Sequence, residues 1–431
     1  MNLKYKLLII TSIIFSLIII EGFILFLELD YKTIVLKSKR FWKVNGIYID
    51  DTDPTKNWFT TSNTYDWCKG SGIINDPYVI ENVAVNGEES PYMYCIYIAY
   101  SSAFFIIRNC IFFNAPRIND RYFSGMYLRS ISNAKILNNN ISYNGDNGIF
   151  FQGDGTNNLI SNNILFNNRR AGIDLEAFYD NCTISSNLIS DNGQDGIVLR
   201  QDCDNNIIKN NKVYNSGYSG ILLQGGSDNN IVKDNLVSQS YRGITIYRYS
   251  SYNTIYNNNL SNSYSNGIHI EESQSNIVQN NIISNNNGDG VRFESWIVVD
   301  NTNNVIYKNL IEGNKGKGVS IDKYSFNNLI CENSFINNTI NAEDKGINNQ
   351  WDNGTIGNYW DDYIGVDAND DGIGDTPYDI TGIANSSDHF PIWDDGVGLC
   401  KPSRFVLNAY YNWDNQLCIL HWWIIYLKRY H

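Results

Sequence analysis

Hydrophobic and polar residues alternate in short segments through most of the chain between residues 116 and 340. Residues 220–224 read Gly-Ile-Leu-Leu-Gln, and residues 243–247 read Gly-Ile-Thr-Ile-Tyr. A period of two residues is typical of β-strands, because successive side chains on a strand point to opposite faces. Glycine and asparagine bound the segments, and no long run with a helical period interrupts them. The pattern therefore predicts a succession of short strands.

These segments recur about every 24 residues, and two columns of residues mark the repeat. One column is a glycine followed by an apolar residue: Gly125, Gly148, Gly172, Gly196, Gly220, Gly243, Gly267, Gly290 and Gly318. The other is an asparagine: Asn140, Asn163, Asn187, Asn211, Asn235, Asn259, Asn281, Asn309 and Asn333. Because the spacings in the two columns vary together from one repeat to the next, each period is one structural unit. A unit of this length closes as a coil of about three strands stacked on its copies, which predicts an all-β, single-stranded parallel β-helix of about 9 to 12 coils.

Both columns have a structural explanation, so neither is assigned a ligand. Tight bends between strands leave backbone groups without partners, and an inward asparagine supplies hydrogen bonds to them and to the asparagines of neighbouring coils. The glycines are expected to supply positive φ angles at the corners. The ends of the stack need caps, since open β-edges aggregate.

The repeat and its flanks suggest an order of segments along the chain. They are an apolar N-terminal segment (1–30), a linker (31–64), an N-terminal cap with the first coils (65–115), the repeats (116–340), a C-terminal cap with a calcium-type loop (341–395) and a tail (396–431).

The N-terminal segment has the composition of a targeting signal. Lys4 and Lys6 precede an apolar run over residues 7–27, which is long enough to cross a bilayer as a hydrophobic helix. The run is typical of a signal peptide or an N-terminal membrane anchor. No small-x-small cleavage site follows it, which favours an uncleaved anchor. We expect the body to lie outside the cytoplasm, at the cell surface, either anchored or secreted.

The formal charge of −13 argues against nucleic acid as a partner, because phosphate binding requires a basic surface. Eight cysteines are too few for a disulfide scaffold in 431 residues. Export of the body would permit one bridge among Cys68, Cys95 and Cys110.

Motifs at both ends of the repeats resemble a known family. Residues 70–72 read Gly-Ser-Gly, residues 76–82 Asp-Pro-Tyr-Val-Ile-Glu-Asn, residues 358–363 Asn-Tyr-Trp-Asp-Asp-Tyr and residues 371–378 Asp-Gly-Ile-Gly-Asp-Thr-Pro-Tyr. Together with the repeat, and over residues 65–393, they resemble archaeal surface proteins of the NosD-like, carbohydrate-binding and sugar-hydrolase (CASH) β-helix group. The resemblance implies a right-handed β-helix, an outside location, glycan contact and, from the family name, copper.

A calcium-type loop lies within the closing motif. Asp367, Asn369, Asp371 and Asp375 would supply side-chain oxygens and Ile373 its carbonyl oxygen, at positions 1, 3, 5, 9 and 7 of the loop, with glycine at position 6. Position 12 is a tyrosine instead of the usual glutamate, so another ligand must complete the site. Three carboxylates are candidates for that ligand: Asp361, Asp362 and Asp379. We expect a structural calcium ion that stabilises the cap.

Copper is not expected from this sequence. Copper prefers His, Met and Cys ligands. The chain has four histidines and three methionines that do not cluster: His269, His389, His421, His431, Met1, Met93 and Met126.

The second and fourth residues after each repeat glycine are predicted to face solvent and to form two columns. The first column is Tyr127, Phe150, Asp174, Val198, Leu222, Thr245, His269, Arg292 and Ser320. The second column is Arg129, Gln152, Glu176, Arg200, Gln224, Tyr247, Glu271, Glu294 and Asp322. Two charged patches result, and their members are the candidate catalytic residues: Asp174, Glu176 and Arg200, and then His269, Glu271, Arg292 and Glu294.

Such patches permit two interpretations. Two suitably spaced carboxylates would serve a glycoside hydrolase, and a base beside a cation would serve a polysaccharide lyase. Alternatively, the charges simply pair across an exposed sheet. The motifs of polygalacturonase relatives are absent, which weakens the enzyme interpretation.

Aromatic residues on or near the same face are candidates for sugar binding, because flat rings stack on the apolar faces of sugars. They are Tyr127, Phe150, Phe178, Tyr179, Tyr247, Tyr249 and Trp296, the last in an expected loop over residues 295–301. The sequence favours a surface protein that binds glycans or envelope polymers. A lyase or hydrolase, a copper-delivery accessory protein and a purely structural adhesion rod are the alternatives.

Overall fold

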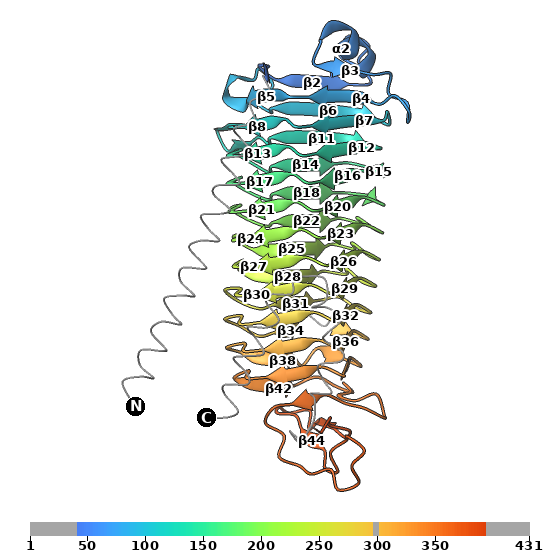
Figure 1. Ribbon diagram of the computed structural model, residues 1–431, viewed down its shortest axis with the longest axis vertical. Coiled ribbons are helices and arrows are strands. Elements are labelled where there is room, and N and C mark those ends of the chain that lie inside the picture. The colour runs from blue at the N-terminus through green and yellow to red at the C-terminus, as the bar shows by residue number, and fades with distance from the viewer. Residues whose placement is uncertain (1–40, 296–300, 394–431) are drawn as a thin grey trace, which may run out of the picture. The chain divides into compact units, whose positions relative to one another are not determined.

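A computed structural model of the protein describes residues 41–295 and 301–393. The compact unit that begins at Lys43 contains a parallel β-helix of stacked coils, as predicted (Figure 1). The predicted N-terminal segment (1–30), the tail (396–431) and Trp296 lie outside the described residues. Within those residues, no helix combines the length and apolar character needed for a membrane span.

Each coil contributes one strand to each of three sheets. The first sheet, called the β2–β42 sheet, contains β2 (Ile47–Asp50), β6 (Ile96–Ser101), β11 (Met126–Ile131), β14 (Ile149–Gln152), β18 (Ile173–Glu176), β22 (Ile197–Arg200), β25 (Ser219–Gln224), β28 (Arg242–Tyr247), β31 (Ile268–Glu271), β34 (Val291–Glu294), β38 (Lys317–Ile321) and β42 (Ile340–Asp344). Its neighbours pair in parallel throughout, which places equivalent residues of successive coils side by side.

The other two sheets have the same order of coils. The second contains β3 (Cys68–Lys69), β4 (Tyr78–Glu81), β7 (Phe105–Arg108), β12 (Ala134–Leu137), β16 (Leu159–Ser161), β20 (Thr183–Ser185), β23 (Ile207–Lys209), β26 (Ile231–Lys233), β29 (Thr254–Tyr256), β32 (Ile277–Gln279), β36 (Val305–Tyr307) and β40 (Leu329–Cys331). The third contains β1 (Trp42–Lys43), β5 (Val83–Asn86), β8 (Ile111–Phe113), β13 (Asn140–Ser142), β17 (Ile164–Phe166), β21 (Leu188–Ser190), β24 (Lys212–Tyr214), β27 (Leu236–Ser238), β30 (Asn259–Ser261), β33 (Ile282–Ser284), β37 (Leu310–Glu312), β41 (Ser334–Ile336) and β43 (Tyr359–Trp360).

Short elements decorate the corners and caps. They are α2 (Trp58–Thr64), the 3₁₀ turn η1 (Gly87–Glu89) and four two-stranded pairs: β9 (Arg117–Ile118) with β10 (Arg121–Tyr122), β15 (Gly155–Thr156) with β19 (Tyr179–Asp180), β35 (Asn301–Thr302) with β39 (Ser325–Phe326), and β44 (Tyr378–Asp379) with β45 (Ser387–Asp388). The linker predicted over 31–64 is wrong for residues 47–64, because β2 joins the first sheet and α2 buries Trp58.

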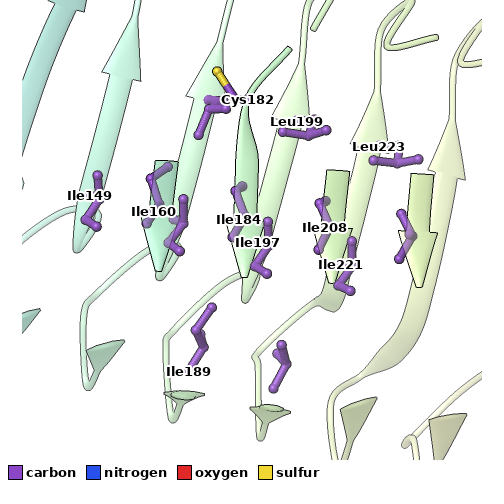
Figure 2. Packing of buried hydrophobic residues seen from close by; sticks show 14 of the residues in the cluster. Ile149, Ile160, Cys182, Ile184, Ile189, Ile197, Leu199, Ile208, Ile221 and Leu223 are labelled. Carbon is purple, nitrogen blue, oxygen red and sulfur yellow. The ribbon is translucent and has the colours of Figure 1, made fainter. Parts of the chain in front are cut away.

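Aliphatic side chains from all three sheets fill the interior of the coils (Figure 2). Ile173 of β18, Ile184 of β20 and Ile189 of β21 meet there within one coil, and each is fully buried. The next coil supplies Ile197 and Ile208 at the equivalent places. Since these residues occupy alternate positions of their strands, the residues between them face outward.

Asparagine ladders run along the interior of the bends, as predicted, but the predicted column needs correction. Asn163 Nδ2 donates to Asn187 Oδ1 at 3.0 Å, and Asn187 repeats the contact with Asn211. In two coils the ladder residues are Asn139 and Asn258 instead of Asn140 and Asn259, which begin strands of the third sheet. Two further ladders, which the sequence interpretation missed, run through Asn144, Asn168 and Asn192, and through Asn276, Asn304 and Asn328.

The prediction that the repeat glycines adopt positive φ is wrong. None of them does, and the left-handed positions are occupied mainly by asparagines of the corners, such as Asn162 and Asn210. Close packing explains the glycines instead. A Cβ atom on Gly220 would lie 2.2 Å from Val237 Cγ1 and 2.9 Å from the carbonyl oxygen of Gly243.

The six cysteines in the described residues are free thiols buried in the protein: Cys68, Cys95, Cys110, Cys182, Cys203 and Cys331. The bridge considered among Cys68, Cys95 and Cys110 is therefore not formed. Burial raises the pKa of the Cys95 thiol to about 12, which keeps it protonated and unreactive.

Candidate functional site

The outward face of the β2–β42 sheet carries both charged patches predicted from the sequence. On β31 the core residues Ile268 and Ile270 alternate with His269 and Glu271, which therefore point away from the core. The register places His269 beside Arg292 and Glu271 beside Glu294 on the next coil. Four residues that are distant in sequence thus form one cluster, here called the His269 cluster.

His269 lies at the centre of this cluster, between two carboxylates. Its Nε2 atom is 3.2 Å from Glu271 Oε2 and 3.5 Å from Glu294 Oε2. Arg292 donates from Nη2 to Glu294 Oε1 at 2.9 Å and contacts Asp289 at 3.3 Å. The residues predicted to face solvent are thus largely covered: the exposed fraction is 0% for His269 and 7% for Glu271. Contacts from neighbouring coils cover them, which the sequence pattern does not reveal.

The hydrogen-bond network assigns the tautomer of His269. The backbone N–H of Asp289 donates to Asn266 Oδ1 at 2.9 Å, which turns the amide nitrogen of Asn266 towards the ring. That nitrogen lies 3.2 Å from His269 Nδ1 and can only donate. Nδ1 must therefore accept, and the ring proton resides on Nε2 between the two glutamates. Because Asn266 precedes the repeat glycine, the sequence interpretation of the outward columns missed it.

The two glutamates have different electrostatic surroundings. Burial lowers the pKa of His269, and Arg242 adds to this effect, although the neighbouring glutamates oppose it; the ring is therefore neutral. Burial raises the pKa of Glu294, but its hydrogen bonds and charge attraction with Arg292 outweigh that effect and lower the pKa overall. Glu271 has no comparable contact with an arginine. Glu294 is therefore held ionised, and Glu271 lies close to the same ring nitrogen of His269.

The second patch surrounds Asp174 on β18. Arg200 Nη2 lies 2.5 Å from Asp174 Oδ2 and 3.5 Å from Glu176 Oε2, and Asn147 Nδ2 donates to Asp174 at 3.2 Å. Burial raises the pKa of Asp174 to about 7, against the opposing effect of Arg200. Burial also raises the pKa of Asp195 to about 6. The structure therefore brings the three predicted residues together and adds Asn147 and Asp195, which precede the repeat glycines.

Buried polar atoms without partners gather on this face. Nine buried side-chain nitrogen or oxygen atoms in the described residues have no hydrogen-bond partner. Five of them lie on the outward side of the β2–β42 sheet or just before its strands: Asp146 Oδ1, Asp174 Oδ1, Arg200 Nε, Arg242 Nε and His269 Nε2. Asp146 Oδ1 does lie 3.3 Å from Arg170 Nε, and His269 Nε2 lies 3.2 Å from Glu271 Oε2, but neither contact has hydrogen-bond geometry. Because such groups are costly in a folded protein, their concentration makes this face the candidate functional surface.

Aromatic side chains extend this face towards the N-terminal coils. The rings of Tyr127 and Phe150 stack with centroids 5.3 Å apart, and Tyr97 adjoins Tyr127 at the same distance. Tyr247 lies beside Glu271 on the sheet, as predicted. Tyr179 does not belong to the face, because its ring is buried and its hydroxyl approaches the backbone N–H of Ile131 at 3.1 Å.

Three exposed tyrosines border the sheet in the turns that precede it, and the sequence interpretation missed them. They are Tyr218, Tyr241 and Tyr264, with exposed fractions of 56%, 47% and 60%. They occupy successive coils, two or three residues before the repeat glycine. Inspection of the residues before each repeat glycine, in addition to those after it, would have identified these tyrosines.

The calcium-type loop has its oxygen atoms turned towards its own backbone. Asp367 Oδ2 accepts from the N–H of Gly372 at 2.7 Å, and Asp375 Oδ2 accepts from the N–H of Ala368 at 2.8 Å. No three His, Cys, Asp or Glu side chains between residues 41 and 393, outside 296–300, converge as they would around a metal ion. The three carboxylates considered as the missing ligand bind other groups: Asp361 and Asp362 accept from Asn341, and Asp379 accepts from Ser387.

The described residues do not fit a copper site. His269 contacts carboxylates and an amide, and His389 contacts Asp352 in the C-terminal cap. Met126 is fully buried in the core, as are the thiols. Imidazole, thioether and thiolate ligands therefore do not meet at any point in this part of the chain.

Two family descriptions match parts of the chain. Residues 78–237 match "Right handed beta helix region", and residues 225–365 match "Periplasmic copper-binding protein (NosD)". No curated protein sequence matches the chain.

Several solved structures are similar to the chain at low sequence identity. The tailspike protein of Dettilon shares 15% identity over 69% of this chain and 58% of its own, with a TM-score of 0.51. The A-module of mannuronan C-5 epimerase AlgE6 from Azotobacter vinelandii shares 15% identity over 65% of this chain and 88% of its own, with a TM-score of 0.48. DFA-IIIase from Arthrobacter chlorophenolicus A6, without its lid, shares 12% identity over 66% of this chain and 94% of its own, with a TM-score of 0.43. By its strand order and the family matches, the chain is a right-handed parallel β-helix protein.

Proposed function

We propose that this protein binds a carbohydrate polymer along the outward face of the β2–β42 sheet. The observation that carries the proposal is the row of half-buried charged side chains and exposed tyrosines that gathers along that face. Sugar hydroxyl groups both donate and accept hydrogen bonds, so they can pair with the half-buried side chains of this face, such as Arg292, Glu294 and Glu176.

The exposed tyrosines support the same ligand class. Tyr241 and Tyr264 present large apolar rings at one border of the sheet, where they can stack on the C–H faces of sugar rings. Adjacent coils repeat at about 4.8 Å, which is close to the length of one pyranose unit in a chain. A linear glycan that follows the coils can therefore meet equivalent groups at each step.

We further infer a location outside the cytoplasm and a relationship to the NosD-like, carbohydrate-binding β-helix group. Two features support the location: the apolar run over residues 7–27 and the match of residues 225–365 to a family described as periplasmic. Copper delivery is not part of the proposal, since the described residues lack a suitable ligand set. Calcium in the loop over 367–375 remains a proposal for stabilising the cap.

A glycan array probed with the full-length chain tests the proposed function. We expect binding to at least one class of polysaccharide, weakened about tenfold or more by the double substitution Tyr241→Ala and Tyr264→Ala. The matched control is Tyr143→Ala, which removes a ring of similar exposure beside the third sheet. Absence of binding to every glycan, or equal loss with the control, would overturn the proposal.

A second function, cleavage of the bound polymer, is favoured by one specific observation. Glu271 and Glu294 both contact a single nitrogen atom of His269, so the two carboxylates are close neighbours in different electrostatic environments. Glycoside hydrolysis needs such a pair, with one group protonating the leaving oxygen and the other acting as nucleophile or base. In the Asp174 patch, the carboxylates of Asp174 and Glu176 contact Arg200 instead of a histidine.

A further inference from the structure

We propose that the polymer bound on this face is an uncharged glycan, rather than a polyuronate or another polyanion. The inference rests on the proposed function and names the class of its ligand. It concerns the central face, defined as the outward positions of the seven strands β14, β18, β22, β25, β28, β31 and β34 together with the two residues before the glycine of each strand.

Carboxylates outnumber guanidinium groups on the central face. The carboxylates are Asp146, Asp174, Glu176, Asp195, Glu271, Asp289 and Glu294. The guanidinium groups are Arg170, Arg200, Arg242 and Arg292. His269 adds no positive charge, because Asn266 occupies its Nδ1 as a donor. Seven acidic groups against four basic ones leave no excess of positive charge to attract an anionic chain.

Most of these arginines are already engaged by acidic neighbours. Arg170 Nε lies 3.3 Å from Asp146, Arg200 lies 2.5 Å from Asp174, and Arg292 lies 2.9 Å from Glu294. A ligand carboxylate that approached one of them would also approach the partner carboxylate. At these separations the repulsion between the two carboxylates offsets the attraction between the ligand and the arginine. The repulsion is stronger beside buried groups than in water.

Protonation of the acidic groups does not reverse this balance. Burial raises the pKa of Asp174 to about 7 and that of Asp195 to about 6, so both lose part of their charge near neutral pH. With both neutral, five carboxylates still face four guanidinium groups. The protein as a whole adds to the repulsion, because its formal net charge is −13.

An uncharged sugar chain fits these groups without that repulsion. Its hydroxyl oxygens can accept from the half-buried guanidinium groups of Arg170 and Arg292, and its hydroxyl groups can donate to Glu176. Ion pairs such as Arg292 with Glu294 offer a donor and an acceptor side by side, which matches neighbouring hydroxyl groups on a sugar ring. The exposed tyrosines then bind the apolar ring faces.

The test compares binding of the full-length chain to polymers of different charge. Neutral mannan, laminarin and dextran, anionic alginate and polygalacturonate, and cationic chitosan are immobilised and titrated at low and high NaCl. We expect the tightest binding to a neutral polymer, with an affinity that salt changes less than about twofold. Alginate and polygalacturonate should bind at least about tenfold more weakly.

The double substitution Glu176→Gln and Glu271→Gln should raise the affinity for alginate and polygalacturonate about tenfold, because it removes two negative charges. The control Asp234→Asn with Glu312→Gln changes the net charge equally, but away from the central face. Tighter binding of alginate, polygalacturonate or chitosan than of every neutral polymer would overturn this inference and leave the proposed function standing. Binding to none of the polymers, here and on the glycan array, would overturn both.

Discussion

Asn266 donates an amide hydrogen to Nδ1 of His269 across 3.2 Å, and the backbone of Asp289 fixes the orientation of that amide. The consequence is a buried, neutral imidazole whose remaining proton faces Glu271 and Glu294. Protonation of Nδ1 would bring two donors together. The network thus reinforces burial in keeping the ring uncharged beside two carboxylates.

Substitution of Asn266 by Asp is expected to raise the pKa of His269 above its value in the native protein. A carboxylate at this position would accept from the N–H of Asp289 and also from a protonated Nδ1, so it would stabilise the imidazolium ion. Histidine-selective NMR titration of the full-length chain measures the change. The control Asn262→Asp, on an exposed corner, should leave the His269 signal unaltered. An unchanged pKa in Asn266→Asp would contradict the assigned tautomer.

Substitution of Asp174 by Asn is expected to change how stability depends on pH. The folded state raises the pKa of this carboxyl to about 7 from 3.8, so between these values the folded protein binds more protons than the unfolded chain. The contribution of Asp174 to stability is therefore present below about pH 4 and is lost as the pH rises towards 7. The asparagine of the variant cannot ionise. As the pH rises from 4 to 8, the free energy of unfolding of Asp174→Asn should therefore increase by up to about 4 kcal/mol relative to that of the native protein.

Denaturant unfolding at several pH values measures this difference. The control is Asp154→Asn at an exposed corner, for which the difference from the native protein should stay constant within about 0.5 kcal/mol. A parallel pH dependence of Asp174→Asn and the native protein would show that Asp174 is ionised as readily as an exposed aspartate.

Substitution of Asn211 by Ala should lower the free energy of unfolding by about 3 to 5 kcal/mol. Asn211 accepts from the backbone and side chain of Asn187 and donates to Asn235 and to the carbonyl of Ile184, all buried. Removal leaves several buried groups without partners. The neighbouring exposed Asn210 has a φ of 56°, so Asn210→Gly serves as the control and should cost less than about 1 kcal/mol. Comparable losses in both variants would refute the ladder as a source of stability.

If the loop over residues 367–375 binds calcium, a chelator should lower the melting temperature of the full-length chain by several degrees, and added calcium should restore it. The side-chain oxygens of the loop accept hydrogen bonds from backbone N–H groups. Coordination of these oxygens by the ion would add further contacts and stabilise the cap. Asp371→Ala, which removes the ligand oxygen, should abolish the response. Asp370→Asn, at the adjacent position that is not part of the ligand pattern, should retain it. A melting temperature indifferent to the chelator would rule out a calcium site.

If the His269 cluster is catalytic, a polysaccharide that binds the protein should release reducing ends when incubated with it. Glu271→Gln and Glu294→Gln should each lower that rate at least about 100-fold, because neither amide can transfer a proton or act as a nucleophile. Glu312→Gln on the third sheet should retain the native rate. Bound polymer that stays intact with the native protein would exclude hydrolysis while leaving binding in place.

The pattern of residues was sufficient to predict strands, coils and the sheet that carries the charged patches. The alternation of Ile268, His269, Ile270 and Glu271 assigned the two faces correctly, because a two-residue period permits only one arrangement once the core is known. The constant spacing also placed Glu271 beside Glu294, since parallel coils in register bring equivalent positions together.

Details within a coil were decided by packing, which the repeat alone does not specify. The ladder residue is Asn139 rather than Asn140, and Gly220 is required for close approach rather than for a positive φ. A shift of one residue between two adjacent asparagines leaves the sequence pattern almost unchanged, yet it moves a side chain from the strand to the interior of the bend.

The sequence by itself determined the architecture, because stacked coils repeat the same local interactions and a periodic pattern encodes them directly. Only the tertiary structure decided the chemistry of the face. Burial of His269, the orientation imposed by Asn266 and the unsatisfied atoms of Arg242 and Asp174 depend on contacts between coils and on the turns before each strand. Solvation and charge at one residue are set by neighbours about a coil away, and no short stretch of sequence contains them.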